Sequence, residues 1–444
     1  MTIAVIKTKA EQQLAAEFER VAATLPGGGW VPAMRKAAMG AFVGTGLPHR
    51  RIEAWKYTDL RALVKEALPP AFGKVAALDD KTLATALGAD LAKLDCIRIV
   101  FVDGIYNPAL ARPGKSDGTG CPYEPLGDVI GKPDWMQAEF EPTGEAKDDP
   151  LLALNAAFVT DGVTMRVIAG TKLEQPIHLV FLSASDKPAA CATRNLIRID
   201  KGAHVTILES HVALAGPARQ SNSVTSLHVC EGANVQHLKL TAEGADATHL
   251  GTWLIDIDAG ATYNAFHMTE SIALARHQLF VTFKGEGAVF TFNAAVLGRG
   301  KSHIDTTMVI DHEVPKCTSR EVLKCVLDDE ARGVFQGKVI VRPDAQKSDG
   351  KQMAKALLLS PNAEFDSKPE LEIYADDVVC GHGSTVAEID EDEVFYLSAR
   401  GIPDRDARAL LTEAFAAEAI DAIAHEGIRE ALRARLNRWL GAAS

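Results

Sequence analysis

The fold is indicated most clearly by residues 195–240, NLIRIDKGAHVTILESHVALAGPARQSNSVTSLHVCEGANVQHLKL. Short β-rich runs alternate here with small and turn residues, and Gly-Ala steps stand between the runs at Gly202-Ala203 and Gly232-Ala233. Glycine allows the tightly bent backbone that a corner needs. The stretch therefore predicts strands joined at tight corners that recur after 30 residues.

The same pattern extends over residues 151–389. Further Gly-Ala steps at Gly260-Ala261 and Gly287-Ala288 follow at intervals of 28 and 27 residues. Signals for tight hairpins are scarce, so we expect successive turns to stack in parallel as a solenoid. We predict a mainly β fold, a parallel β-helix, with a sandwich or barrel as the alternative. The strands expected most clearly are 164–169, 177–183, 195–199, 204–208, 224–229, 235–241 and 253–257.

The two ends of the chain have a different texture. Residues 1–90 are rich in Ala, Leu, Lys and Glu with apolar residues at helical spacing, and the region after residue 390 is also helical in pattern. We therefore expect three parts: a mainly helical N-terminal domain with a linker over 1–149, the β-helix over 150–390, and a helical domain over 391–444.

The C-terminal end of the β-rich region contains the segment Cys380-Gly381-His382-Gly383-Ser384. In a strand, Cys380, His382 and Ser384 would lie on one face. A thiol beside an imidazole suits a soft metal or an iron–sulfur centre, but such centres usually take about four ligands. The pair is thus either half of a site completed elsewhere, or a cysteine packed as a small apolar residue.

The helical tail offers a second candidate surface. Pro403 fixes a helix start, and an apolar stripe with Leu410, Leu411 and Phe415 follows it. These helices either cover the end of the solenoid or bind a partner protein.

Composition excludes several classes of function. The 444 residues carry a net charge of −12, which argues against binding to nucleic acid or to an anionic membrane surface. There is no apolar run long enough to cross a bilayer and no signal-peptide pattern, so a cytoplasmic location is expected. Seven scattered cysteines without a Cys-x-x-Cys predict reduced thiols and no permanently bound cluster.

The segment Gly298-Arg299-Gly300-Lys301-Ser302 lacks the first glycine of a phosphate-binding loop, so we do not expect ATP hydrolysis.

A series of ordered motifs runs along the chain: Glu53-Ala54-Trp55-Lys56-Tyr57-Thr58, Asp311-His312, Gly333-Val334-Phe335, Ala345-Gln346-Lys347, Pro369-Glu370-Leu371-Glu372-Ile373, Cys380-x-His382-Gly383 and Phe395-Tyr396-Leu397. Together these motifs resemble one known family, the SufB/SufD proteins of iron–sulfur cluster assembly. The resemblance is dense over residues 311–402, and His382 is followed by Gly383, as in the SufD-like member rather than the SufB-like one.

This resemblance implies a right-handed parallel β-helix between helical domains, and a non-catalytic scaffold that pairs with a SufB-like paralogue. It implies a transient cluster at that interface, with His382 and Cys380 as candidate ligands. It further implies that a SufC-like ABC-type ATPase, which alone would bind ATP, docks on the C-terminal helices. Homodimers could form without the partner. Two alternatives remain from the residues: a β-helix polysaccharide lyase that uses paired acids such as Asp328-Asp329, and a structural module in which Cys380 and His382 are merely packed.

Overall fold

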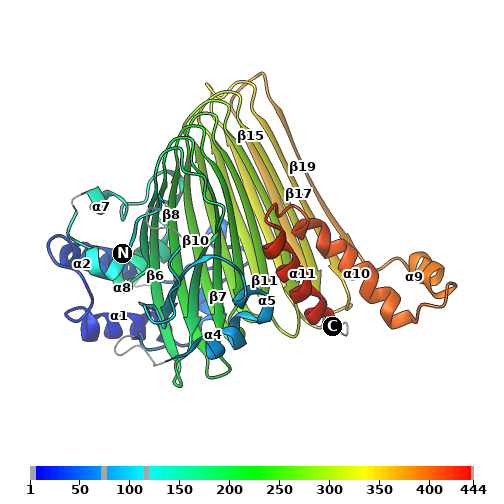
Figure 1. The fold of residues 1–444 in the computed structure, drawn as a ribbon, viewed down its shortest axis with the longest axis horizontal. Coiled ribbons are helices and arrows are strands. Elements are labelled where there is room, and N and C mark those ends of the chain that lie inside the picture. Colours follow the sequence, from blue (N-terminus) through cyan, green and yellow to red (C-terminus); the bar gives the residue numbers. More distant parts are fainter. Residues whose placement is uncertain (1–6, 72–77, 115–119, 134, 442–444) are drawn as a thin grey trace, which may run out of the picture.

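The computed structural model describes residues 7–71, 78–114, 120–133 and 135–441. Its centre is a parallel β-helix made of two facing sheets, and consecutive strands alternate between them so that each turn adds one strand to each sheet (Figure 1). The predicted mainly β solenoid is therefore confirmed.

One sheet has ten strands in the order β19-β17-β15-β13-β11-β9-β7-β5-β1-β2. Its members are β1 (Ile97–Val102), β2 (Ile105–Tyr106), β5 (Ile177–Ser183), β7 (His204–Ala213), β9 (Asn234–Ala242), β11 (Thr262–Glu270), β13 (Val289–Gly298), β15 (Thr318–Leu327), β17 (Asp349–Leu358) and β19 (Val379–Ala387). The other sheet has nine strands: β3 (Tyr123–Pro125), β4 (Val163–Val167), β6 (Ala189–Ile199), β8 (Arg219–Val229), β10 (Gly244–Ile257), β12 (Ile272–Phe283), β14 (His303–His312), β16 (Arg332–Val341) and β18 (Glu364–Ile373).

The Gly-Ala steps form corners, as predicted. Gly202, Gly232, Gly260 and Gly287 have φ angles of 65°, 65°, 60° and 69°. Side-chain-bearing residues rarely adopt this conformation, so glycine is favoured at each corner. The strands are longer than predicted, because the sequence pattern marked only part of β6, β7, β8 and β10.

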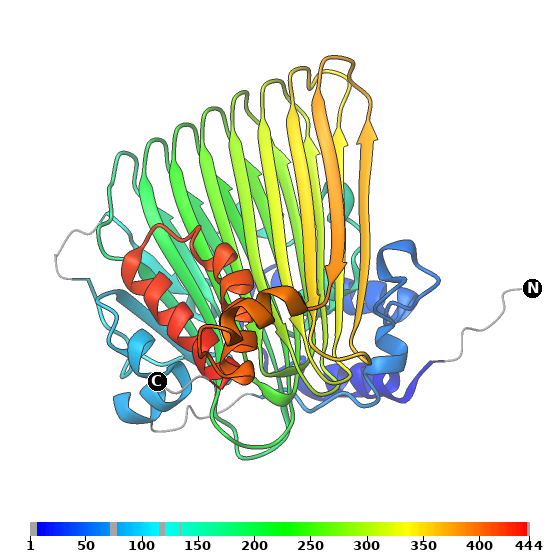
Figure 2. The same ribbon diagram turned by 90° about the vertical axis from the view of Figure 1, so that its right-hand side faces the viewer.

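Helices cover both outer faces of the solenoid. On the nine-stranded sheet, α1 (Lys9–Val21), α2 (Val31–Thr45) and α8 (Pro150–Phe158) share an apolar cluster with the outward side chains Ala192, Leu250 and Leu274. On the ten-stranded sheet, the cover consists of α4 (Asp80–Leu87), α5 (Ala89–Ala92), α10 (Asp404–Ile420) and α11 (Glu426–Leu440) (Figure 2).

The interpretation that the C-terminal helices close the end of the solenoid is wrong. Residues Ala416, Ile420 and Leu432 pack on outward residues of the ten-stranded sheet such as Leu240 and Phe266, because that face is itself apolar. The remaining short elements are η1 (Glu53–Trp55), α3 (Leu60–Leu63), α6 (Leu126–Val129), α7 (Trp135–Ala138), η2 (Gly144–Ala146) and α9 (Glu391–Ser398).

The two ends of the solenoid differ. At the first end, the short strands β2 and β3 pair antiparallel with β1 and β4. At the other end, β18 and β19 are the last strands of their sheets, and their side chains are half-buried or exposed. The solenoid is thus open at its C-terminal end.

Candidate functional site

Cys380 and His382 both lie on β19, the last strand of the ten-stranded sheet. Cys380 pairs in register with Gly350 and His382 with Gln352 on β17. A Cβ atom on Gly350 would lie 3.3 Å from Val339 Cγ1 of the facing sheet and 3.7 Å from Cys380 Sγ. The row that contains Cys380 therefore continues the face of the sheet that lines the solenoid interior.

That interior face is uncovered on the last turn. Cys380 is half-buried against the core, whereas His382 and Ser384 are exposed. Burial raises the pKa of the Cys380 thiol, so the free thiol stays protonated until a metal or a positive charge displaces its proton. The predicted row of Cys380, His382 and Ser384 on one face is present, and its imidazole is reachable by another molecule.

Two ligands on one strand supply half of a metal centre. Residues two apart on a strand are separated by roughly 7 Å, so the imidazole and the thiol reach one metal ion or one cluster only through rotation of their side chains. In the described parts of the chain, the three-residue group with ligand atoms close enough for one metal ion is His228, Cys230 and Asp258, which does not include Cys380 or His382. A cluster at β19 would need ligands from a second molecule.

Exposed apolar side chains surround this open end. Val379 and Val386 lie at opposite ends of β19, and Ile373 and Tyr374 lie at the end of β18. We call these four residues the open-end patch. Unpaired strand edges with apolar side chains readily take up another chain, so this end of the solenoid has the character of a protein-binding surface.

Of the residues predicted for the ATPase surface, some are exposed in the structure and others pack against the solenoid. Pro403 is the N-cap of α10 and is exposed, and Leu410 is exposed on the same helix. Leu411 is half-buried, and Phe415 packs against the sheet with Lys324 Nζ 4.5 Å from its ring centroid. Pro403 and Leu410 thus remain available to a partner, whereas Phe415 holds α10 in place.

Helix α9 adds exposed aromatic residues that the prediction of this surface did not include. Phe395 is 74% exposed and Tyr396 is 56% exposed, on a helix that extends away from the solenoid (Figure 1). The motif Phe395-Tyr396-Leu397 was the feature of the sequence that could have revealed this surface. Aromatic side chains on an outlying helix bury little surface within their own chain, so they are available to a partner.

The N-terminal motif of residues 53–58 connects the helical region to the solenoid. The Trp55 ring lies 3.7 Å from the Arg276 guanidinium, and Arg276 also donates to the Ala54 carbonyl at 2.8 Å. Arg276 forms an ion pair with Asp305, and both side chains are fully buried. Thr58 donates to the same carboxylate. The motif therefore shields a buried ion pair of the solenoid.

The solenoid interior contains a polar section that the sequence did not reveal. Glu209 is fully buried and accepts hydrogen bonds from His237 at 3.0 Å and Thr225 at 2.8 Å. Burial holds the pKa values of His249, His267 and His277 well below the ordinary value, so these imidazoles are neutral. The buried titratable members of this section are Glu209, His211, His237, Lys239, Glu243, His249, His267 and His277. In the sequence these residues have the alternating pattern of a solvent-exposed strand face, because polar residues that point inward alternate in the same way as polar residues that point outward.

Comparison with known proteins identifies relatives for nearly the whole chain. The model for the N-terminal region of SufBD proteins matches residues 8–179, and the model for the SufBD core domain of the iron–sulfur cluster assembly system matches residues 181–415. The chain is 32% identical to the iron–sulfur cluster assembly protein SufD of Escherichia coli, over 89% of this chain and 90% of that protein. It is 33% identical to a SufBD family protein of Synechocystis, over 87% and 86% of the two chains. It is 26% identical to SufD of Bacillus subtilis, over 69% and 70%.

Proposed function

Because the chain belongs to the SufBD family of iron–sulfur cluster assembly proteins, we propose that it is a non-catalytic scaffold subunit of an assembly complex. In this proposal it pairs with a SufB-like paralogue through its open end, and a nascent cluster, the cargo of the complex, forms at that interface. The observation that carries the proposal is the exposed His382 beside the half-buried Cys380 on the last strand of an open solenoid.

The open end of the solenoid supports the proposed pairing. The outer edge of β19 presents backbone donors and acceptors, and the open-end patch supplies apolar surface around it. A second SufBD-type solenoid could add its own last strand to this edge and cover the patch. The same geometry permits a homodimer when the paralogue is absent.

The two candidate ligands have distinct roles in this proposal. His382 is a nitrogen ligand or a proton acceptor at the interface, and its exposed side chain is directly accessible to the partner. Cys380 provides a thiolate once metal binding displaces the proton that burial favours. Ligands from the paralogue would complete the set of about four that iron–sulfur centres require.

A SufC-like ATPase would dock on α9 and the first half of α10. This surface exposes Phe395, Tyr396, Pro403 and Leu410, while the other side of α10 packs on the solenoid. ATP would bind to that partner alone. The segment from Gly298 to Ser302 joins strands β13 and β14, so it lacks the strand-to-helix geometry of a phosphate-binding loop.

A cytoplasmic location belongs to the proposal as well. Across the parts of the chain that the structure describes, every helix is too short or too polar to traverse a bilayer. Because the chain belongs to the SufBD family, we propose a role in cluster assembly rather than polysaccharide lyase activity. The paired acids of that alternative are turn residues: Asp328 lies 3.5 Å from Arg299, and Asp329 accepts from the Gly300 amide at 2.9 Å.

Reconstitution of the complex tests the proposal. Cluster formation on the chain with its paralogue and ATPase should be followed by visible absorbance, with iron and sulfide measured in the isolated complex. His382→Ala should abolish or strongly slow formation while the complex still assembles. Formation at the full rate with both His382→Ala and Cys380→Ser would refute the role of this site.

A further inference from the structure

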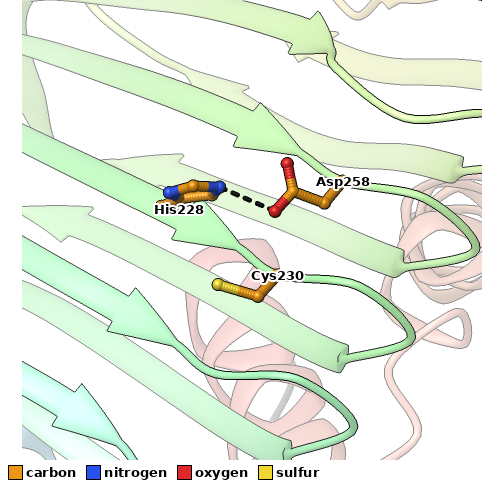
Figure 3. A group of neighbouring side chains, drawn as sticks. All are labelled: His228, Cys230 and Asp258. Carbon is orange, nitrogen blue, oxygen red and sulfur yellow. Dashed lines mark hydrogen bonds and ion pairs between the residues drawn. The ribbon is translucent and has the colours of Figure 1, made fainter.

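Three side chains of types that bind metal ions lie close together at a corner far along the chain from β19. His228 and Cys230 lie at the end of β8 and just after it, and Asp258 follows β10 on the next turn (Figure 3). His228 Nε2 lies 2.9 Å from Asp258 Oδ2, and one ligand atom from each of the three residues lies within 4.8 Å of the others. His228 and Cys230 are two residues apart in the sequence, and the register of the solenoid brings Asp258 beside them.

The donor set points to a particular class of cation. A thiolate, an imidazole and a carboxylate together suit a dication of borderline softness such as Zn²⁺, whereas Mg²⁺ and Ca²⁺ prefer oxygen ligands alone. In a tetrahedral zinc site the ligand atoms are roughly 3.3–3.8 Å apart. The three side chains therefore need only small rotations to reach that geometry.

The corner borders a groove large enough for a small molecule. A cavity of about 810 Å³ lies between the outer face of the nine-stranded sheet and the segment that carries α7 and η2. His228 lines this groove together with Arg166, Arg198, Asp256 and Thr282. Three protein ligands leave a fourth position free, as in zinc sites that bind a water molecule or a substrate.

One neighbour opposes metal binding. Arg198 Nη1 lies 3.1 Å from His228 Nδ1, and Arg198 Nε also donates to Asp200 at 3.0 Å. Coordination through Nε2 moves the imidazole proton to Nδ1, so Arg198 must release that atom. The Cys230 proton, which burial favours by raising the thiol pKa, passes to solvent when the metal binds.

We propose that His228, Cys230 and Asp258 form a binding site for one Zn²⁺-like dication at the edge of the groove, separate from the Cys380–His382 site. Its fourth position takes a ligand from the groove or from solvent. A simple surface ion pair between His228 and Asp258 explains their short distance, but it does not require the thiol of Cys230 beside them.

Cobalt titration of the full-length, metal-stripped chain tests this site. We expect one Co²⁺ per chain with a thiolate-to-cobalt charge-transfer band in the near ultraviolet, and Zn²⁺ should displace the Co²⁺. Cys230→Ser should abolish the band, and Asp258→Asn should weaken binding at least tenfold. Arg198→Gln should strengthen binding, because it removes a positive charge and the competing hydrogen bond.

Cysteine variants show which thiol binds the metal ion. Cys96→Ser removes a thiol that is 7% exposed, comparable to Cys230 at 6%, and should leave the band unchanged. X-ray absorption of the zinc-loaded wild-type protein needs no variant and should show one sulfur neighbour with nitrogen or oxygen neighbours. The proposal is overturned if wild-type protein gives no sulfur-to-metal band, or if the band survives Cys230→Ser; loss of the band in Cys380→Ser would then assign it to the Cys380–His382 site.

Discussion

Gln352 and His382 occupy paired positions on the adjacent parallel strands β17 and β19, yet Gln352 is 2% exposed and His382 is exposed. The difference arises because a following turn covers Gln352 and none covers His382. The same row continues to the buried Glu321 on β15. A position that is core on every inner turn becomes an accessible site on the last one.

Replacement of His382 should separate function from stability. His382→Ala should leave the free energy of unfolding within about 0.5 kcal/mol of wild type, since the side chain is exposed. Cluster formation in the reconstituted complex should fall at least tenfold. Ser384→Ala, an exposed neighbour on the same face, should keep the wild-type rate. A large loss of thermal stability in His382→Ala would instead indicate a packing role.

A charge at the strand edge should weaken the proposed pairing with a SufB-like paralogue. Val386→Lys places a cation in the open-end patch, where burial against a partner would desolvate it. We expect at least tenfold weaker association by calorimetry with little change in the melting temperature. Val43→Lys on α2 alters an equally apolar, 43% exposed residue away from this end and should not affect association. Equal affinity of the two variants would exclude the open end as the interface.

The proposed ATPase-binding surface can be tested by a substitution on α10. Leu410→Asp should weaken ATPase binding at least tenfold, because Leu410 is exposed and its replacement adds charge to an apolar surface. Leu63→Asp, at a comparably exposed position of α3, is the control. Pull-down with the purified ATPase measures both. Phe415→Ala should instead lower thermal stability, since that ring packs on the sheet.

Glu321 should make stability depend on pH. Burial raises its pKa to about 8 from 4.5, so the folded chain keeps a proton that the unfolded chain releases. Below pH 4.5 the side chain of Glu321 is protonated in both states, and its contribution to the free energy of unfolding is at its maximum. As the pH rises toward 8, this free energy falls by up to about 1.4 kcal/mol per pH unit. Glu321→Gln cannot ionise. Its stability relative to wild type should therefore increase from pH 5 to pH 8 in denaturant titrations. A difference that does not change with pH would show that Glu321 is charged in the folded state.

The buried ion pair behind the N-terminal motif should be costly to break. Asp305→Asn leaves the Arg276 guanidinium buried without a counter-charge and should destabilise the protein by about 3–5 kcal/mol. Glu313→Gln removes the carboxylate from an exposed pair with Lys284, at 2.9 Å, and should cost less than about 1 kcal/mol. Urea denaturation measures both. Similar costs would mean that water reaches Asp305.

Sequence predicted the solenoid well because its corners require glycine, and Gly202, Gly232 and Gly260 recur in the sequence at the turn length. It predicted only part of β7, since Glu209 and His211 point inward and interrupt the apolar alternation that marks a strand. It left open which surface the C-terminal helices meet, because an apolar stripe does not specify its partner; the structure shows that they pack on the outer face of the ten-stranded sheet.

The row of Cys380 and His382 followed from strand periodicity, but their accessibility depends on where the stack of turns ends. The group of His228, Cys230 and Asp258 was missed, although a signal existed. Cys230 and Asp258 are 28 residues apart, the same interval that separates Gly232 from Gly260. Adding the turn length to each cysteine position would have brought these side chains together.

The unequal ends of the solenoid also limit how far such a protein can assemble. The first end is finished by the short antiparallel strands β2 and β3, so that among the described residues only the end at β18 and β19 offers full-length strand edges. Two chains that meet end to end use up both available edges. If chains pair through this end as proposed, growth would stop at a pair, and a fold with the same stacked geometry as a fibril would not extend into one.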